Sequence, residues 1–143
     1  MMRSLLIALA IAGTLAGCQQ LPPSPQDLQA KKFEAVPDKA VIYLVRDAPD
    51  FSDLQAQIRL GDNLLLKTYP GTYYRWEVPA GKHTITGYGE DNGTITVQVE
   101  RGKIYFVQQR VTGMRLPSSR FDLASEPEGR AAVLRAVLLA GGS

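Results

Sequence analysis

The sequence has few of the side chains that build catalytic and metal sites. Its 143 residues include one cysteine and one histidine. A single cysteine excludes an intramolecular disulfide, and with a single histidine a zinc site would depend almost entirely on carboxylates. The serine-nucleophile motif Gly-x-Ser-x-Gly is also missing. With 16 basic and 14 acidic residues, the chain lacks the excess charge that attracts nucleic acid. We therefore expect neither an enzyme, nor a metal site, nor a nucleic-acid partner.

The N-terminus has the pattern of a secretory signal. Met1–Arg3 is basic and Leu5–Ala12 is apolar, and this run is too short to span a membrane. The following Leu15–Cys18, Leu-Ala-Gly-Cys, resembles the lipobox of bacterial lipoproteins. That resemblance implies a signal peptide over residues 1–17, with diacylglycerol on the Cys18 thiol and an acyl chain on its new N-terminus. The alternative is an ordinary cleavable signal next to an unrelated cysteine.

The residues after Cys18 bear on location. In the lipoprotein class that this segment resembles, aspartate after the cysteine favours retention in the inner membrane. Gln19 and Gln20 stand there instead, so we expect anchoring in the outer membrane, facing the periplasm. Cleavage of the signal peptide would remove Arg3 and leave 15 basic and 14 acidic residues in the mature chain.

Residues 18–38 are predicted to be a lipidated tether. Leu21–Pro25 is proline-rich and favours extended polyproline geometry. Gln26–Val36 has the composition of a brief helix, which Pro37 would end. About twenty such residues could hold a domain a few tens of Å from the bilayer, at about 3 Å per residue.

Residues 39–113 consist of short β-rich segments that are separated by turn residues. About seven strands at roughly ten-residue spacing predict an all-β fold, a small antiparallel β-sandwich with a small barrel as the alternative. The expected strands are Ala40–Arg46, Leu54–Leu60, Leu64–Tyr69, Thr72–Val78, His83–Tyr88, Thr94–Glu100 and Lys103–Thr112.

Residues 114–143 are predicted to be a loop and a C-terminal α-helix. Ser125–Glu128 has the pattern of a capping box, with proline in the first turn. The helix is expected to reach about Ala140 and is apolar on most sides. It would therefore pack on the sheet, or dock part of its surface on a partner protein or the membrane.

Two segments resemble a family of bacterial lipoproteins that carries a domain of unknown function. They are Ala40–Arg46, read as a Val-Tyr-Val-Tyr-Arg-like strand, and Tyr73–Ile85, read as a hairpin. The hairpin is also similar to that of PEGA-type and carboxypeptidase-regulatory-like β-sandwich modules. Those modules usually serve as adhesion, spacer or binding units. The resemblance covers Ala40–Val111 and implies a β-sandwich fold and no particular activity.

The candidate contact surface is polar and aromatic. Alternation in the strand places Tyr74 and Trp76 in the core, so Tyr73, Arg75 and Glu77 share the opposite face. Exposed tyrosine beside arginine is typical of contacts with a glycan or a protein. The alternative is cross-strand pairing that only stabilises the sheet. Leu134 and Leu138 are the corresponding candidates on the helix.

Two weaker patterns are interpreted as structural. His83 would need an acidic partner, such as Glu77, to act as a general base, and we expect an ordinary strand-edge residue. Asp47, Asp50 and Asp53 lack the alternating spacing of a calcium loop, and we expect a solvated loop.

Together these patterns predict a non-catalytic envelope lipoprotein that acts as a binding or scaffolding module in the periplasm. Its expected partners are the membrane, through the lipid, and an envelope protein or peptidoglycan. A binder of cell-wall glycan or of a small ligand is the alternative, with a small hydrolase after it.

Overall fold

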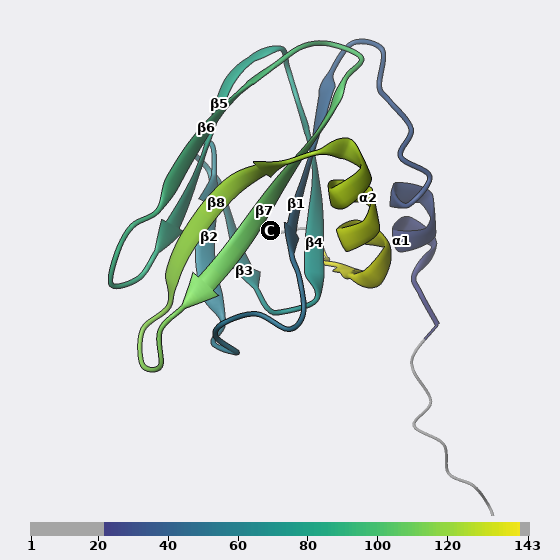
Figure 1. The fold of residues 1–143 in the computed structure, drawn as a ribbon. Helices are drawn as coiled ribbons and strands as arrows, with labels where there is room; N and C mark the ends of the chain where they lie inside the picture. Colours follow the sequence, from purple (N-terminus) through teal and green to yellow (C-terminus); the bar gives the residue numbers. More distant parts are fainter. Residues whose placement is uncertain (1–21, 141–143) are drawn as a thin grey trace, which may run out of the picture.

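Two β-sheets packed face to face form the centre of the molecule (Figure 1). The computed structural model describes residues 22–140. One sheet has five strands in the order β8-β7-β1-β4-β9, and the other has four in the order β3-β2-β5-β6. The strands are β1 Ala40–Arg46, β2 Ala56–Leu60, β3 Leu64–Thr68, β4 Thr72–Val78, β5 Gly81–Tyr88, β6 Thr94–Val99, β7 Ile104–Thr112, β8 Ser118–Ala124 and β9 Val137–Leu138. The predicted β-sandwich is confirmed.

The strand pairing is antiparallel except at two places, where β1 pairs with β7 and β4 pairs with β9 in parallel. The seven expected strands correspond to β1 to β7. The structure adds β8, where a loop was expected, and β9, where the helix was expected to continue.

The five-stranded sheet is covered on both faces, and β1 shows why. Alternate β1 residues such as Ile42 and Leu44 enter the core between the two sheets. Val41, Tyr43 and Val45 point the other way, into a second core on the outer face of this sheet. All seven residues of β1 are buried, as the continuous apolar run predicts.

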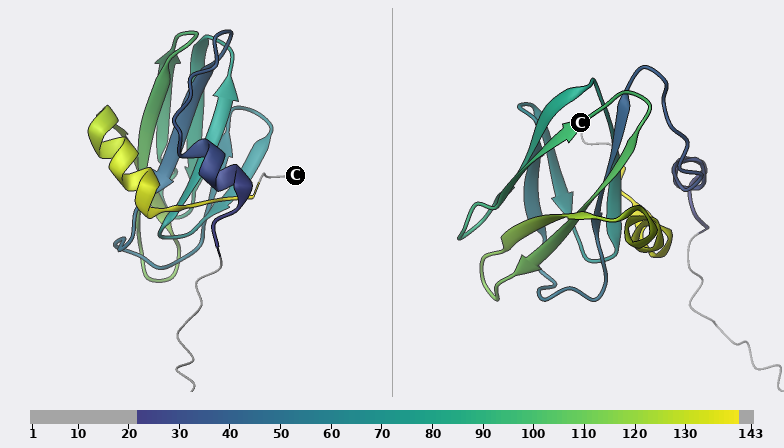
Figure 2. Two further views of the ribbon diagram at one scale, coloured as in Figure 1. Left: turned by 90° about the vertical axis from the view of Figure 1, so that its right-hand side faces the viewer. Right: turned by 45° about the horizontal axis from the view of Figure 1, so that its top comes forward.

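The second core lies beneath two helices, α1 Pro25–Ala30 and α2 Glu126–Arg135, which share this outer face (Figure 2). Ser24 caps α1, its Oγ accepting from the Asp27 N–H at 3.1 Å. Ala30 is buried, and Phe33 packs on Tyr43 with ring centroids 5.3 Å apart. Part of the segment expected to be a tether, residues 18–38, therefore packs on the sandwich through α1, Phe33 and Val36.

Helix α2 packs on its own sheet, against β1 and β7. Ser125 caps it as predicted, accepting from the Glu128 N–H. The expected end near Ala140 is wrong. The helix ends at Arg135, Ala136 is extended, and Val137–Leu138 pairs with β4 instead. No helix in residues 22–140 is long and apolar enough to cross a membrane.

The two sheets approach closely at β8. A Cβ atom on Gly89 would overlap the carbonyl group of Pro117, and one on Gly93 would overlap that of Ser119. Glycine at both places lets the β5–β6 end of one sheet contact β8 of the other.

Candidate functional site

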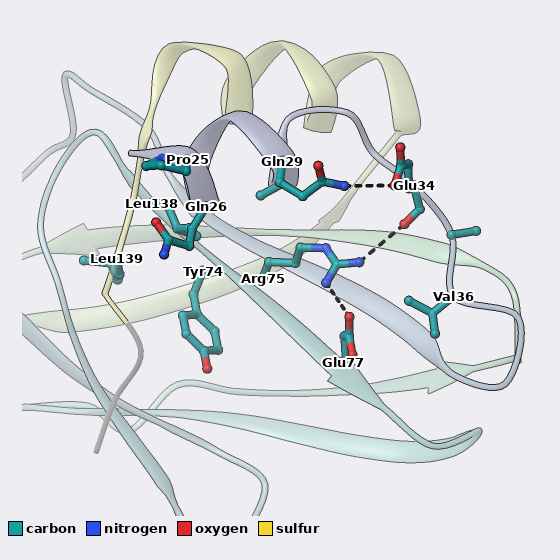
Figure 3. Close-up of a pocket in the computed structure, with 12 residues that line it drawn as sticks. Pro25, Gln26, Gln29, Glu34, Val36, Tyr74, Arg75, Glu77, Leu138 and Leu139 are labelled. Atoms are coloured by element: carbon teal, nitrogen blue, oxygen red, sulfur yellow. Dashed lines mark hydrogen bonds and ion pairs between the residues drawn. The ribbon is translucent and has the colours of Figure 1, made fainter. Parts of the chain in front are cut away.

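A pocket of about 630 Å³ lies between α1, the loop that follows it and the edge of β4 (Figure 3). Strand β4 contributes its central residues, and the segment after β9 closes one end. The lining residues are Pro25, Gln26, Gln29, Ala30, Glu34, Ala35, Val36, Tyr74, Arg75, Glu77, Leu138 and Leu139. The pocket therefore combines a mostly apolar wall with a small number of charged groups.

The Arg75 guanidinium is held against the sheet by three acceptors. Its Nη1 donates to Glu77 Oε1 at 2.6 Å, its Nε to the Tyr43 hydroxyl at 3.2 Å and its Nη2 to the Glu34 carbonyl at 3.4 Å. Burial lowers the pKa of Arg75, but the hydrogen bonds to Glu77 and Tyr43 raise it above its ordinary value. Arg75 is therefore a fixed positive charge in the pocket.

Tyr73 is on the predicted face of β4, but its expected exposure is wrong. The side chain is 1% exposed, because α1 lies over it and Leu138 of the paired strand β9 packs beside it. Its hydroxyl donates to Asp27 Oδ1 at 2.7 Å. Burial and the neighbouring Asp27 carboxylate raise the pKa of Tyr73 far above its ordinary value. Tyr73 joins the helix to the sheet and offers no surface to a partner.

Asp27 is the buried centre of that junction. Besides Tyr73, its carboxylate accepts from Lys31 Nζ at 3.0 Å and from the Leu138 N–H at 3.2 Å. Lys31 Nζ also donates to the Ala136 carbonyl at 2.7 Å. One carboxylate thus connects α1, β4 and β9, which fixes the walls of the pocket. Within the sequence, Asp27 stands in the brief helix expected over Gln26–Val36 of the tether, and nothing there signals burial.

The other candidate residues do not all lie at one site. Glu77 and Leu138 line the pocket with Arg75, so the structure brings three of the candidates together. Leu134 is 57% exposed on α2 and is not part of the pocket. Cys18, the expected lipid attachment site, lies outside the described residues.

His83 has no carboxylate as a hydrogen-bond or ion-pair partner within residues 22–140. Its Nε2 is 2.7 Å from the Pro79 carbonyl oxygen, and its ring meets Trp76 edge-on at 5.4 Å. Glu77, the acid considered for it, is paired with Arg75. The contacts of His83 are those of a hairpin residue, and they do not form an acid–base pair.

The acidic loop after β1 was expected to be solvated, but two of its three aspartates are paired with arginines. Asp50 pairs with the buried Arg46 at 2.7 Å and accepts from the Val111 N–H at 3.0 Å. Asp47 pairs with Arg135 of α2 at 2.6 Å. Only Asp53 is exposed as expected. In the described part of the chain, no three histidine, cysteine, aspartate or glutamate residues gather as a metal site would require.

The comparisons with known proteins add no assignment. The chain matches no protein-family model and no curated protein.

Proposed function

We propose that this chain is a lipid-anchored protein of the bacterial envelope that acts as a non-catalytic binding module. The lipobox-like Leu15–Cys18 supports the anchor, and the pocket beside β4 supports the binding role. The observation that carries the proposal is the pocket itself: about 630 Å³, mainly apolar walls and one fixed guanidinium. Binding sites of this size commonly combine apolar lining with a small number of oriented polar groups.

The position of the pocket agrees with a function at the membrane. Pro25 begins α1 and lines the pocket, and it follows Cys18 by seven positions. A fully extended chain of that length spans at most about 25 Å. A lipid on Cys18 would therefore keep the pocket close to the bilayer, where a membrane-associated partner would meet it.

A binder of cell-wall glycan or of a small ligand is the second candidate, and Arg75 is the observation that favours it. The fixed Arg75 guanidinium could pair with a carboxylate, and the half-buried Tyr74 ring, which lines the pocket from the other face of β4, could stack on a sugar. This alternative predicts retention on isolated peptidoglycan that Arg75→Ala abolishes. Tyr73→Ala would not test it, because Tyr73 is buried.

The proposal is tested by crosslinking in intact cells. A photo-reactive amino acid replaces Gln29, an exposed residue of the pocket, and in a matched control replaces Gln98, an exposed residue of β6. We expect one recurrent envelope protein to be captured from position 29 and not from position 98. In Cys18→Ser, the protein should move to the soluble fraction and the capture should fall.

Three results decide between the alternatives. Capture of the same protein from both positions would contradict the proposed surface. Retention on peptidoglycan without protein capture would support the glycan alternative. Capture that is unchanged in Cys18→Ser would contradict the role of the anchor.

A further inference from the structure

Strand β4 is paired along only part of its outer edge. Strand β9 pairs with Thr72 and Tyr73, and the last backbone bond on this side runs from the Leu139 N–H to the Tyr73 carbonyl at 2.8 Å. The rest of β4 has β1 on its other side and no strand beside this edge among the described residues.

The direction of the backbone groups follows from the pairing. Because the Tyr73 carbonyl points to β9, the N–H and C=O groups of Arg75 and Glu77 point the same way, at the two-residue period of a strand. The N–H and C=O groups of Tyr74 and Trp76 point to β1. Within residues 22–140, the backbone groups of Arg75 and Glu77 have no backbone partner.

The pocket runs beside this unpaired edge. Arg75 and Glu77 line it from β4, and Leu138 and Leu139 stand at the end where β9 stops (Figure 3). Charged side chains often protect edge strands from pairing. Here the Arg75 guanidinium is drawn over the outer face by Tyr43 and Glu34, which leaves the edge itself accessible.

We propose that an extended segment of a partner protein binds in this pocket by adding a strand to β4, in line with β9. The segment would hydrogen-bond to the outward backbone groups of Arg75 and Glu77, as in other cases of strand addition. This inference rests on the proposed function and specifies the chemistry of the partner.

The side chains of the pocket define which segment fits. On the outer face, two carboxylates, Glu34 and Glu77, line the pocket with one cation, Arg75, which is ion-paired with Glu77, so one negative charge is in excess. A basic side chain opposite Glu77 would complement this charge. On the inner face, an apolar side chain would lie beside Tyr74, which is half-buried at the margin of the core. The segment is therefore expected to alternate apolar and basic residues.

Amide hydrogen exchange of the full lipidated protein in detergent micelles tests this inference. The probe is a short synthetic peptide that alternates valine and lysine. In the free protein we expect the Arg75 and Glu77 amides to exchange rapidly, and with the peptide to slow at least about tenfold. The same peptide N-methylated at alternate amides keeps its side chains but loses its donors, and should leave both amides unprotected.

Two variants at one position separate backbone from charge. Glu77→Pro removes the outward N–H at an edge position, where proline is tolerated, and should weaken peptide binding at least about tenfold. Glu77→Thr keeps that N–H and, like Glu77→Pro, loses the carboxylate with its bond to Arg75, so binding should weaken by no more than about fivefold.

Several outcomes would overturn the inference. Slow exchange of both amides in the free monomer would show that this chain's own residues occupy the edge. Protection that rises with protein concentration would assign it to a second copy. Equal binding of the N-methylated peptide would exclude strand addition. If any of these results is found and a protein is still captured from position 29, strand addition is wrong but the proposed binding function stands.

Discussion

Individual buried polar residues connect parts of the chain that are distant in sequence. Arg46 is 1% exposed and donates to Asp50, to the Leu54 carbonyl at 2.8 Å and to the Thr68 carbonyl at 3.1 Å. Asp27 has the same role on the outer face of the five-stranded sheet. Burying a charge is costly unless it is paired and hydrogen-bonded, and both residues meet this condition.

Replacement of Asp27 by asparagine should destabilise the protein. Asparagine is almost the same size, but it loses the ion pair with Lys31 and weakens the bond from Tyr73. Because hydrogen bonds to charged groups contribute about 1.5–3 kcal/mol, we expect the free energy of unfolding to fall by about that amount at neutral pH. Urea denaturation measures it. Asp38→Asn, at an exposed aspartate, is the control and should change stability by less than about 0.5 kcal/mol.

The same carboxylate should make stability depend on pH. Burial raises the pKa of Asp27, but the hydrogen bonds from Tyr73 and Lys31 outweigh it and lower the pKa below its ordinary value of 3.8. Because the pKa of Asp27 is lower in the folded state, its ionised carboxylate stabilises the fold fully above pH 3.8. This stabilisation is lost as the pH falls through the folded pKa. The stability gap between the wild type and Asp27→Asn should therefore narrow in acid. A gap that stays constant down to about pH 2 would contradict this assignment.

Elements with clear alternation could be predicted from the sequence, and those that depend on a neighbour could not. Ile95, Val97 and Val99 face the core as their alternation predicts. Strand β8 begins with two serines after a proline and therefore has the composition of a loop. Strand β9 is two residues long and exists because β4 offers it a partner. For the candidate site, alternation placed Arg75 and Glu77 on the correct face. It could not show that α1, from the expected tether, covers Tyr73.

The packing of α2 on β7 depends on one glycine. Gly129 is buried in the helix, and a methyl group there would overlap Phe106, whose ring stacks on Tyr43 at 5.3 Å. Helix propensity favours alanine over glycine by about 1 kcal/mol. Overpacking costs about 1–3 kcal/mol, which equals or exceeds this gain. We therefore expect Gly129→Ala to lower the free energy of unfolding by up to about 2 kcal/mol. Urea denaturation measures the change.

A double variant identifies the cause. Phe106→Ala removes Cγ and Cδ1, two of the three atoms that the new methyl group would overlap, so adding Gly129→Ala to it should cost less than adding it to the wild type. Equal costs in the two backgrounds would show that the glycine does not act through Phe106.

At the scale of the whole molecule, the two helices make the sandwich asymmetric. Both lie on the outer face of the five-stranded sheet, while within residues 22–140 no helix lies over the outer face of the four-stranded sheet (Figure 2). The covered face holds the pocket and α1, the first described element after Cys18. If Cys18 carries the lipid proposed above, force on that lipid would act first on α1.

This arrangement predicts that two N-terminal truncations differ sharply. A chain that begins at Ser24 keeps the α1 cap and should be as stable as the full chain. A chain that begins at Pro37 loses Ala30, Phe33 and Val36 from the second core. Burial of these apolar groups contributes at least about 3 kcal/mol, and the free energy of unfolding should fall by that amount. Binding of an apolar dye should rise as the core is uncovered. Equal stability of the two chains would assign α1 to the tether and remove the wall on which the binding pocket depends.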